Sequence, residues 1–69
     1  MEYLRVVGEN IGAVRRAEGM EVEELAEAVR VSPEYIQRLE EGGEDVTLSV
    51  LVKVAKVLKS SVHDLTAGI

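Results

Sequence analysis

The sequence predicts an all-α fold, a compact five-helix bundle formed by a single domain that spans residues 1–69. Apolar side chains recur at every third or fourth position along most of the chain, which is the spacing that lines one face of a helix. Glycine, proline and hydroxyl residues, which start or stop helices, separate these periodic segments. A chain of 69 residues has no room for a second domain.

The expected helices follow from this periodicity and from the breaks between the segments. They cover residues 3–18, 21–29, 33–41, 47–58 and 62–66. The first helix contains Gly8 and Gly12, each of which weakens a helix by up to ~1 kcal/mol, so its start is expected anywhere from Tyr3 to Val7. Gly19 closes this helix, since a glycine just past a helix end readily takes the left-handed conformation.

The stretch from Glu21 to Gly42 contains two short amphipathic helices joined by a tight corner. Ser32 is a natural N-cap for the second helix, and Pro33 occupies the first helical position, where its missing N–H costs nothing. Two helices with so short a corner are typical of a helix-turn-helix. On other scaffolds this unit places its second helix in the major groove of DNA.

The charges are distributed unevenly around this unit. Residues 18–45 carry ten carboxylates and two arginines, a net charge of −8, whereas the rest of the chain carries +3. Contacts of Lys and Arg with phosphates supply most of the non-specific affinity for DNA. The segment predicted to read DNA is therefore the most acidic part of the chain, which argues against ordinary tight binding. The acids of the second helix also have a simple structural role, because carboxylates are favourable at the positive end of a helix dipole.

The fourth expected helix has a wide apolar arc, roughly 220° at 100° per residue, which is about twice the width of one core-facing stripe. One face contains Leu48, Leu51, Ala55 and Leu58, and a flanking face contains Val50, Val54 and Val57. A second burial surface is implied. The candidate contact face between two copies of the chain consists of Val50, Val54, Val62 and Ile69. These four residues could instead complete the core of a monomer.

Composition argues against several classes of protein. The chain has no cysteine and one histidine, so neither a disulfide nor a metal site is expected, and the lack of disulfides fits the cytoplasm. No apolar run is long enough for a membrane span or a signal peptide. Without a phosphate loop or room for a sizeable pocket, no enzyme activity, cofactor or small-molecule substrate is expected. His63 is expected to be a solvated surface residue.

Short motifs spread over nearly the whole chain carry a family resemblance. They are Gly8-Glu9-Asn10-Ile11, Glu18-Gly19-Met20, Glu23-Glu24-Leu25-Ala26, Val31-Ser32, Leu39-Glu40-Glu41-Gly42, Thr47-Leu48 and Val54-Ala55-Lys56-Val57-Leu58. With these motifs the chain resembles the Cro/C1-type helix-turn-helix domains, the XRE family of phage repressors, restriction-modification controllers and many antitoxins. The resemblance implies a lambda-repressor-like five-helix fold. It also implies a structural ion pair between Arg15 and Glu40.

The same resemblance implies which residues would contact DNA. The positions that face base edges in the family correspond to Pro33, Glu34, Gln37 and Arg38. Gln37 and Arg38 could read adenine or guanine. By contrast, Pro33 cannot hydrogen-bond a base, and Glu34 can only accept, chiefly from cytosine.

Neighbouring positions would contact the DNA backbone. Ser32 would donate to a phosphate, and Arg30 would steady the backbone from a corner position that the family often gives to glycine. Tyr35 could touch phosphate or ribose, or it could pack against the fourth helix. Another departure from the family lies at Glu21 and Val22, where a hydroxyl or Asn cap followed by Gln is usual.

Two hypotheses for function follow. The first is a sequence-specific transcriptional regulator of the repressor or controller type, which binds double-stranded DNA as a homodimer with the third helix as recognition helix. The second is a helix-turn-helix scaffold used for protein–protein association, or a designed or redesigned sequence on this fold, with weak or no DNA binding. The acidic segment and the wide valine face motivate the second hypothesis.

Overall fold

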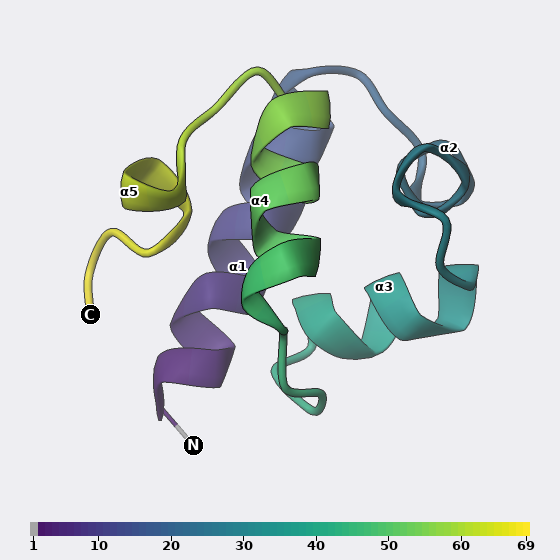
Figure 1. Ribbon diagram of the computed structural model, residues 1–69. Helices are drawn as coiled ribbons and strands as arrows, with labels where there is room; N and C mark the ends of the chain where they lie inside the picture. Colours follow the sequence, from purple (N-terminus) through teal and green to yellow (C-terminus); the bar gives the residue numbers. More distant parts are fainter. Residues whose placement is uncertain (1) are drawn as a thin grey trace.

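The structure, a computed structural model that describes residues 2–69, contains five helices in that range and no strand (Figure 1). The helices are α1 (Glu2–Ala17), α2 (Val22–Val29), α3 (Pro33–Glu40), α4 (Leu48–Val57) and α5 (Val62–Leu65). The predicted all-α, five-helix fold is confirmed. Each observed boundary lies within one residue of the expected one. Helix α1 runs unbroken through Gly8 and Gly12 from Glu2, one residue before the earliest expected start.

Apolar side chains from all five helices meet in one core. The fully buried larger members are Ile11, Val29, Leu25, Ile36, Val54, Leu58 and Leu65. In this arrangement α3 packs against α1 and α2, whereas α5 packs against α1 and α4. Figure 1 shows the α2–α3 pair on one side of α1 and α4, and α5 with the C-terminus on the other side. The helix-turn-helix therefore lies away from the C-terminal end of the chain.

Local hydrogen bonds define where the helices begin. The hydroxyl oxygens of Ser32, Thr47 and Ser61 each accept a bond from the backbone N–H three residues further on, at 3.1, 3.3 and 3.0 Å. At the start of α2 the carboxylate of Glu24 reaches back to accept from the N–H of Glu21, at 2.9 Å. Each bond satisfies a backbone donor that the helix itself leaves without a partner.

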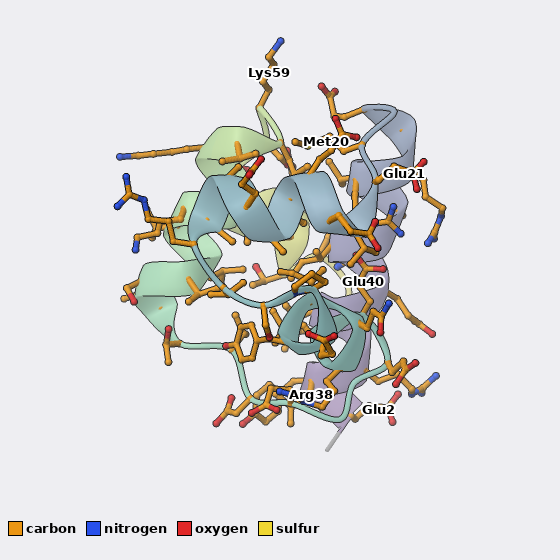
Figure 2. The ribbon with its side chains drawn as sticks, turned by 90° about the vertical axis from the view of Figure 1, so that its right-hand side faces the viewer. Glu2, Met20, Glu21, Arg38, Glu40 and Lys59 are labelled. Atoms are coloured by element: carbon orange, nitrogen blue, oxygen red, sulfur yellow. The ribbon has the colours of Figure 1, made fainter. Side chains whose placement is uncertain are left out.

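A forked ion pair joins α1 to the end of α3, as the resemblance implied. Arg15 Nε and Nη2 donate to the two carboxylate oxygens of Glu40, at 2.7 and 3.1 Å, and Arg15 Nη1 donates to the Met20 carbonyl at 2.8 Å. Both side chains are largely buried, with 11% and 13% of their surfaces exposed, and Glu40 lies between α3 and α1 in Figure 2. The hydrogen bond to Glu40 raises the pKa of Arg15 above its ordinary value, against an opposing effect of burial.

The placement of Val54 on a contact face between two copies is wrong, because Val54 is completely buried and helps to complete the core of the monomer, which was the alternative. Leu48 was expected on the same face of α4 as Leu51, Ala55 and Leu58, but it is 70% exposed whereas those three are buried. The reason is that α4 packs against α2 on one side and α5 on another, so the wide apolar arc is covered mainly within the chain. Leu48 is the first residue of α4 and lies just outside that packed region.

The C-terminal segment is fixed to the first helix by a polar contact. Asn10 on α1 donates from its amide nitrogen to the carbonyls of Leu65 and Ala67, both at 2.9 Å. These bonds satisfy carbonyl groups at the end of α5 that the short helix cannot satisfy itself. None of the helices within residues 2–69 is both long enough and apolar enough to cross a membrane.

Candidate nucleic-acid interface

The corner between α2 and α3 has the geometry that the sequence predicts. Arg30 adopts the left-handed conformation, with φ 64° and ψ 47°, as expected for a position that glycine often occupies. This turn lets the backbone N–H groups of Arg30 and Val31 bond to the carbonyls of Glu27 and Ala26, at 3.2 and 3.0 Å. Ser32 and Pro33 then begin α3 as N-cap and first helical residue. The chain turns from α2 into α3 within three residues without leaving these α2 carbonyls unsatisfied (Figure 1).

The outer face of α3 is polar and exposed. Ile36 and Leu39 bury the inner face, which leaves Glu34, Gln37 and Arg38 exposed on the side that points away from the core. Pro33 is half-buried at the start of the helix. Three of the four positions expected to face bases are thus accessible, and two of these three can donate to a base edge.

The residues expected to contact the DNA backbone flank this face. Arg30 and Ser32 are both exposed at the corner that precedes α3. The oxygen of Ser32 already accepts the capping bond from the Tyr35 N–H, at 3.1 Å. Because a hydroxyl carries one donor besides its acceptor sites, the Ser32 O–H is still available for a phosphate oxygen.

Tyr35 packs against the core, and its partner is the loop that follows α3. Its side chain is half-buried, and its hydroxyl donates to the carbonyl of Asp45, at 3.3 Å. Burial raises the pKa of Tyr35 above its ordinary value, and the negative charges of Glu44 and Asp45 add to that rise while Arg38 opposes it. The hydroxyl is therefore engaged in holding the loop.

An ion pair that the sequence analysis did not anticipate lies beside the outer face of α3. Arg38 Nε donates to the carboxylate of Glu44, at 2.9 Å, with 52% and 35% of the two side-chain surfaces exposed. The loop after α3 turns back sharply at Gly42, where φ is 78°, and the N–H of Gly43 bonds to the Arg38 carbonyl at 3.0 Å. In the sequence, the adjacent glycines at 42 and 43 are the one signal that could have suggested that the loop folds back toward α3.

Acidic side chains border the interface on its α2 side. An open groove of about 400 Å³ between α2 and the start of α3 is lined by Glu23, Glu24, Ala26, Glu27, Val31 and Pro33. Its three carboxylates are exposed and would lie near DNA phosphates if α3 entered a groove of the duplex. Within residues 2–69, no cluster of three or more His, Cys, Asp or Glu side chains could hold a metal ion.

The remaining residues of the expected contact face, on α4, α5 and the C-terminal tail, are less buried than Val54. Val50 and Val62 are half-buried against the core, and Ile69 is 70% exposed. Ile69 also lines an apolar hollow of about 450 Å³ together with Glu2, Tyr3, Val6 and Gly68. The accessible apolar surface in this region comes from α1 and the tail more than from the valines of α4.

The family model described as helix-turn-helix matches residues 11–65, which include the corner, α3 and its flanking helices. The chain belongs to the helix-turn-helix family. The expected resemblance is thereby confirmed. No curated protein matches the chain.

Solved structures of gene regulators share this fold. The clp gene regulator ClgR from Corynebacterium glutamicum is 36% identical, with a TM-score of 0.89 over 91% of this chain and 67% of its own. The restriction-modification controller protein C.AhdI from Aeromonas hydrophila is 26% identical, with a TM-score of 0.89 over 94% of this chain and 98% of its own. The N-terminal DNA-binding domain of SinR from Bacillus subtilis is 32% identical, with a TM-score of 0.82 over 88% of this chain and 90% of its own. These relatives are a gene regulator, a controller protein and a DNA-binding domain.

Proposed function

We propose that the protein is a cytoplasmic transcriptional regulator that binds a specific sequence of double-stranded DNA as a homodimer. The observation that carries this proposal is the exposed outer face of α3, with Gln37 and Arg38, on a chain of the helix-turn-helix family. Membership of that family and the similarity to a DNA-binding domain support α3 as the recognition helix.

In this proposal α3 lies in the major groove, and its two donor side chains read base edges. Arg38 can donate two parallel bonds to guanine, and Gln37 can form the matching pair of bonds with adenine. Ser32 and Arg30 contact the phosphates that flank the groove, and they set the register of the helix without reading sequence.

The acidic surroundings make non-specific binding weak. Arg30 and Arg38 are the only cations in residues 18–45, against ten carboxylates. Attraction to phosphates at any DNA sequence is therefore small, whereas each good base contact still contributes ~1–3 kcal/mol of discrimination. We therefore expect a moderate affinity for the specific DNA site and a much lower affinity for other sequences.

Dimerisation would supply the second half of the binding energy. The apolar surface at Val62 and Ile69 lies on the side of the molecule away from α3, so a symmetric contact there leaves both recognition helices free (Figure 1). Val50 lies on α4, which packs against α5, and could extend this contact. Two protomers related by a two-fold axis would present their recognition helices to successive turns of one face of the duplex.

The test begins with selection of bound sites from a random duplex library at low salt, followed by titration of the selected site. Arg38→Ala should weaken binding to that site about tenfold, because it removes a two-bond base contact. Lys59→Ala is the matched control, since it also removes one positive charge but lies at the opposite end of the molecule from Arg38 in Figure 2. Failure to select any site, or equal effects of the two variants, would contradict the proposal.

The alternative function, protein–protein association without DNA binding, is favoured by the acidic groove along α2. Such a groove repels a duplex but suits a partner with basic side chains. Sedimentation equilibrium separates the two functions when it is combined with the DNA titration. A tight oligomer that binds no duplex at low salt would favour this alternative.

A further inference from the structure

We infer that Glu44 is a positioning residue for sequence recognition. Its carboxylate orients the guanidinium of Arg38 toward guanine, although Glu44 itself need not touch DNA. This inference rests on the proposed function, and it assigns part of the specificity of α3 to the loop that follows the helix.

The ion pair uses one defined edge of the guanidinium. Arg38 Nε donates to Glu44 Oε1 at 2.9 Å, and the two terminal nitrogens of Arg38 have no partner among residues 2–69. Those nitrogens together present two parallel donors, which match the adjacent acceptors O6 and N7 of guanine. With Nε–H occupied, the terminal edge is the one that is free to form a forked contact.

The loop that carries Glu44 is fixed on both sides. Before it, the N–H of Gly43 bonds to the Arg38 carbonyl at 3.0 Å, and Gly42 packs closely against the backbone of Arg5. After it, the Asp45 carbonyl accepts the hydroxyl of Tyr35 at 3.3 Å. The backbone that carries the Glu44 carboxylate is thus already ordered, so little further backbone entropy is lost when Glu44 pairs with Arg38.

Glu44 would also affect DNA binding through its negative charge, and this effect differs from the orientation of Arg38. Charge repulsion from phosphates weakens binding to every sequence alike, whereas orientation of Arg38 strengthens binding only where guanine lies opposite. Asp45 carries the same charge one residue further along and is exposed, but no bond joins its carboxylate to Arg38. The ratio of specific to non-specific affinity therefore separates the two effects.

The magnitude of the orienting effect is bounded by the strength of the pair. Both side chains are partly exposed, so the pair belongs to the class of surface salt bridges. The interaction free energy of such a pair is small and limits the change in specificity to about fivefold. A loss of about three- to fivefold in the specificity ratio is consequently the expected result of removing the Glu44 carboxylate.

The experiment measures dissociation constants for a selected duplex and for the same duplex with its guanines replaced, using the full chain. The specificity ratio is the dissociation constant of the duplex without guanines divided by that of the selected duplex. Glu44→Ala should lower this ratio about three- to fivefold, while Asp45→Ala leaves the ratio unchanged and strengthens both complexes slightly. Glu44→Gln should retain most of the ratio, because its amide oxygen can still accept from Nε–H. In an Arg38→Ala background, Glu44→Ala should have no effect on the ratio.

Two negative results have distinct meanings. If the wild-type protein binds a selected duplex but Glu44→Ala and Asp45→Ala act alike, the role of Glu44 is wrong and the proposed function stands. A selected site without an Arg38-dependent guanine would also overturn the role of Glu44. If the wild-type protein binds no duplex at low salt, the proposed function is wrong, and this inference is overturned with it.

Discussion

The backbone of Gly8 on α1 lies against the Leu39 carbonyl at the end of α3, so closely that a methyl group on Gly8 would overlap that oxygen. Only glycine permits this approach of the two helices. The contact lies one helical turn before Gly12, where a Cβ atom would be 3.2 Å from a carboxylate oxygen of Glu40. The position of α3 on the bundle therefore depends on Gly8, whereas Gly12 faces side chains that can move.

The first prediction concerns Gly8. Gly8→Ala should destabilise the protein by about 2 kcal/mol, because overlap with a backbone carbonyl outweighs the gain of up to ~1 kcal/mol in helix propensity. Gly12→Ala should cost less, since its added methyl group meets the movable side chains of Arg16 and Glu40. Urea unfolding of both variants provides the measurement, and a Gly8→Ala protein that is more stable than wild type would refute this account of the α1–α3 contact.

The second prediction concerns the ion pair between Arg15 and Glu40. Glu40→Ala should cost about 3 kcal/mol, because it leaves a largely buried guanidinium without its carboxylate partner. Glu27→Ala removes an exposed carboxylate of α2 and should cost several times less. Chemical denaturation measures both changes. Equal losses of stability would show that the forked pair adds nothing beyond an ordinary surface residue.

The third prediction concerns the stability of the fold at alkaline pH. Because burial and nearby carboxylates raise the pKa of Tyr35, the folded state keeps this proton at a pH where the unfolded chain loses it. Stability should therefore be unaffected well below the ordinary tyrosine pKa of about 10 and should fall as pH rises through it. Tyr35→Phe should make this fall shallower, and an unchanged fall would contradict this role of Tyr35. Thermal melts between about pH 8 and 11 provide the comparison.

The fourth prediction compares a buried apolar residue of α4 with exposed apolar residues on α4 and at the C-terminus. Val54→Lys should unfold the protein, because it places a charge in the fully buried core, whereas Leu48→Lys on the same helix should remain folded. Ile69→Lys should also remain folded, and it should weaken a homodimer if the C-terminal face is the contact. Circular dichroism and sedimentation equilibrium test both statements. A folded Val54→Lys monomer would instead place Val54 at an interface.

Local signals account for the parts of the fold that could be predicted from the sequence. Ser32, Pro33 and Gly19 act within one helical turn of themselves, so they indicate helix ends without knowledge of tertiary structure. Burial on α4 could not be predicted in the same way. Whether Val54 or Leu48 is covered depends on the placement of α2 and α5, which the periodicity of one helix does not specify.

The candidate interface was predicted only in part for a related reason. The exposed positions of α3 follow from its apolar pattern, and the pair between Arg15 and Glu40 followed from the family resemblance. The pair between Arg38 and Glu44 depends on the path of an irregular loop, which turns on the backbone conformation of Gly42. No periodic pattern encodes such a path, so the residue proposed to orient Arg38 emerged only from the structure.

The most direct test of the central claim, that α3 reads DNA from an acidic surface, is a titration of the selected duplex over a series of salt concentrations. The slope of log affinity against log salt is about −0.9 for each phosphate that is neutralised. With Arg30 and Arg38 as the exposed cations of the helix-turn-helix itself, a dimer should bind in the micromolar range at low salt with a slope between about −2 and −4. No detectable binding at tens of micromolar protein in low salt would contradict the claim.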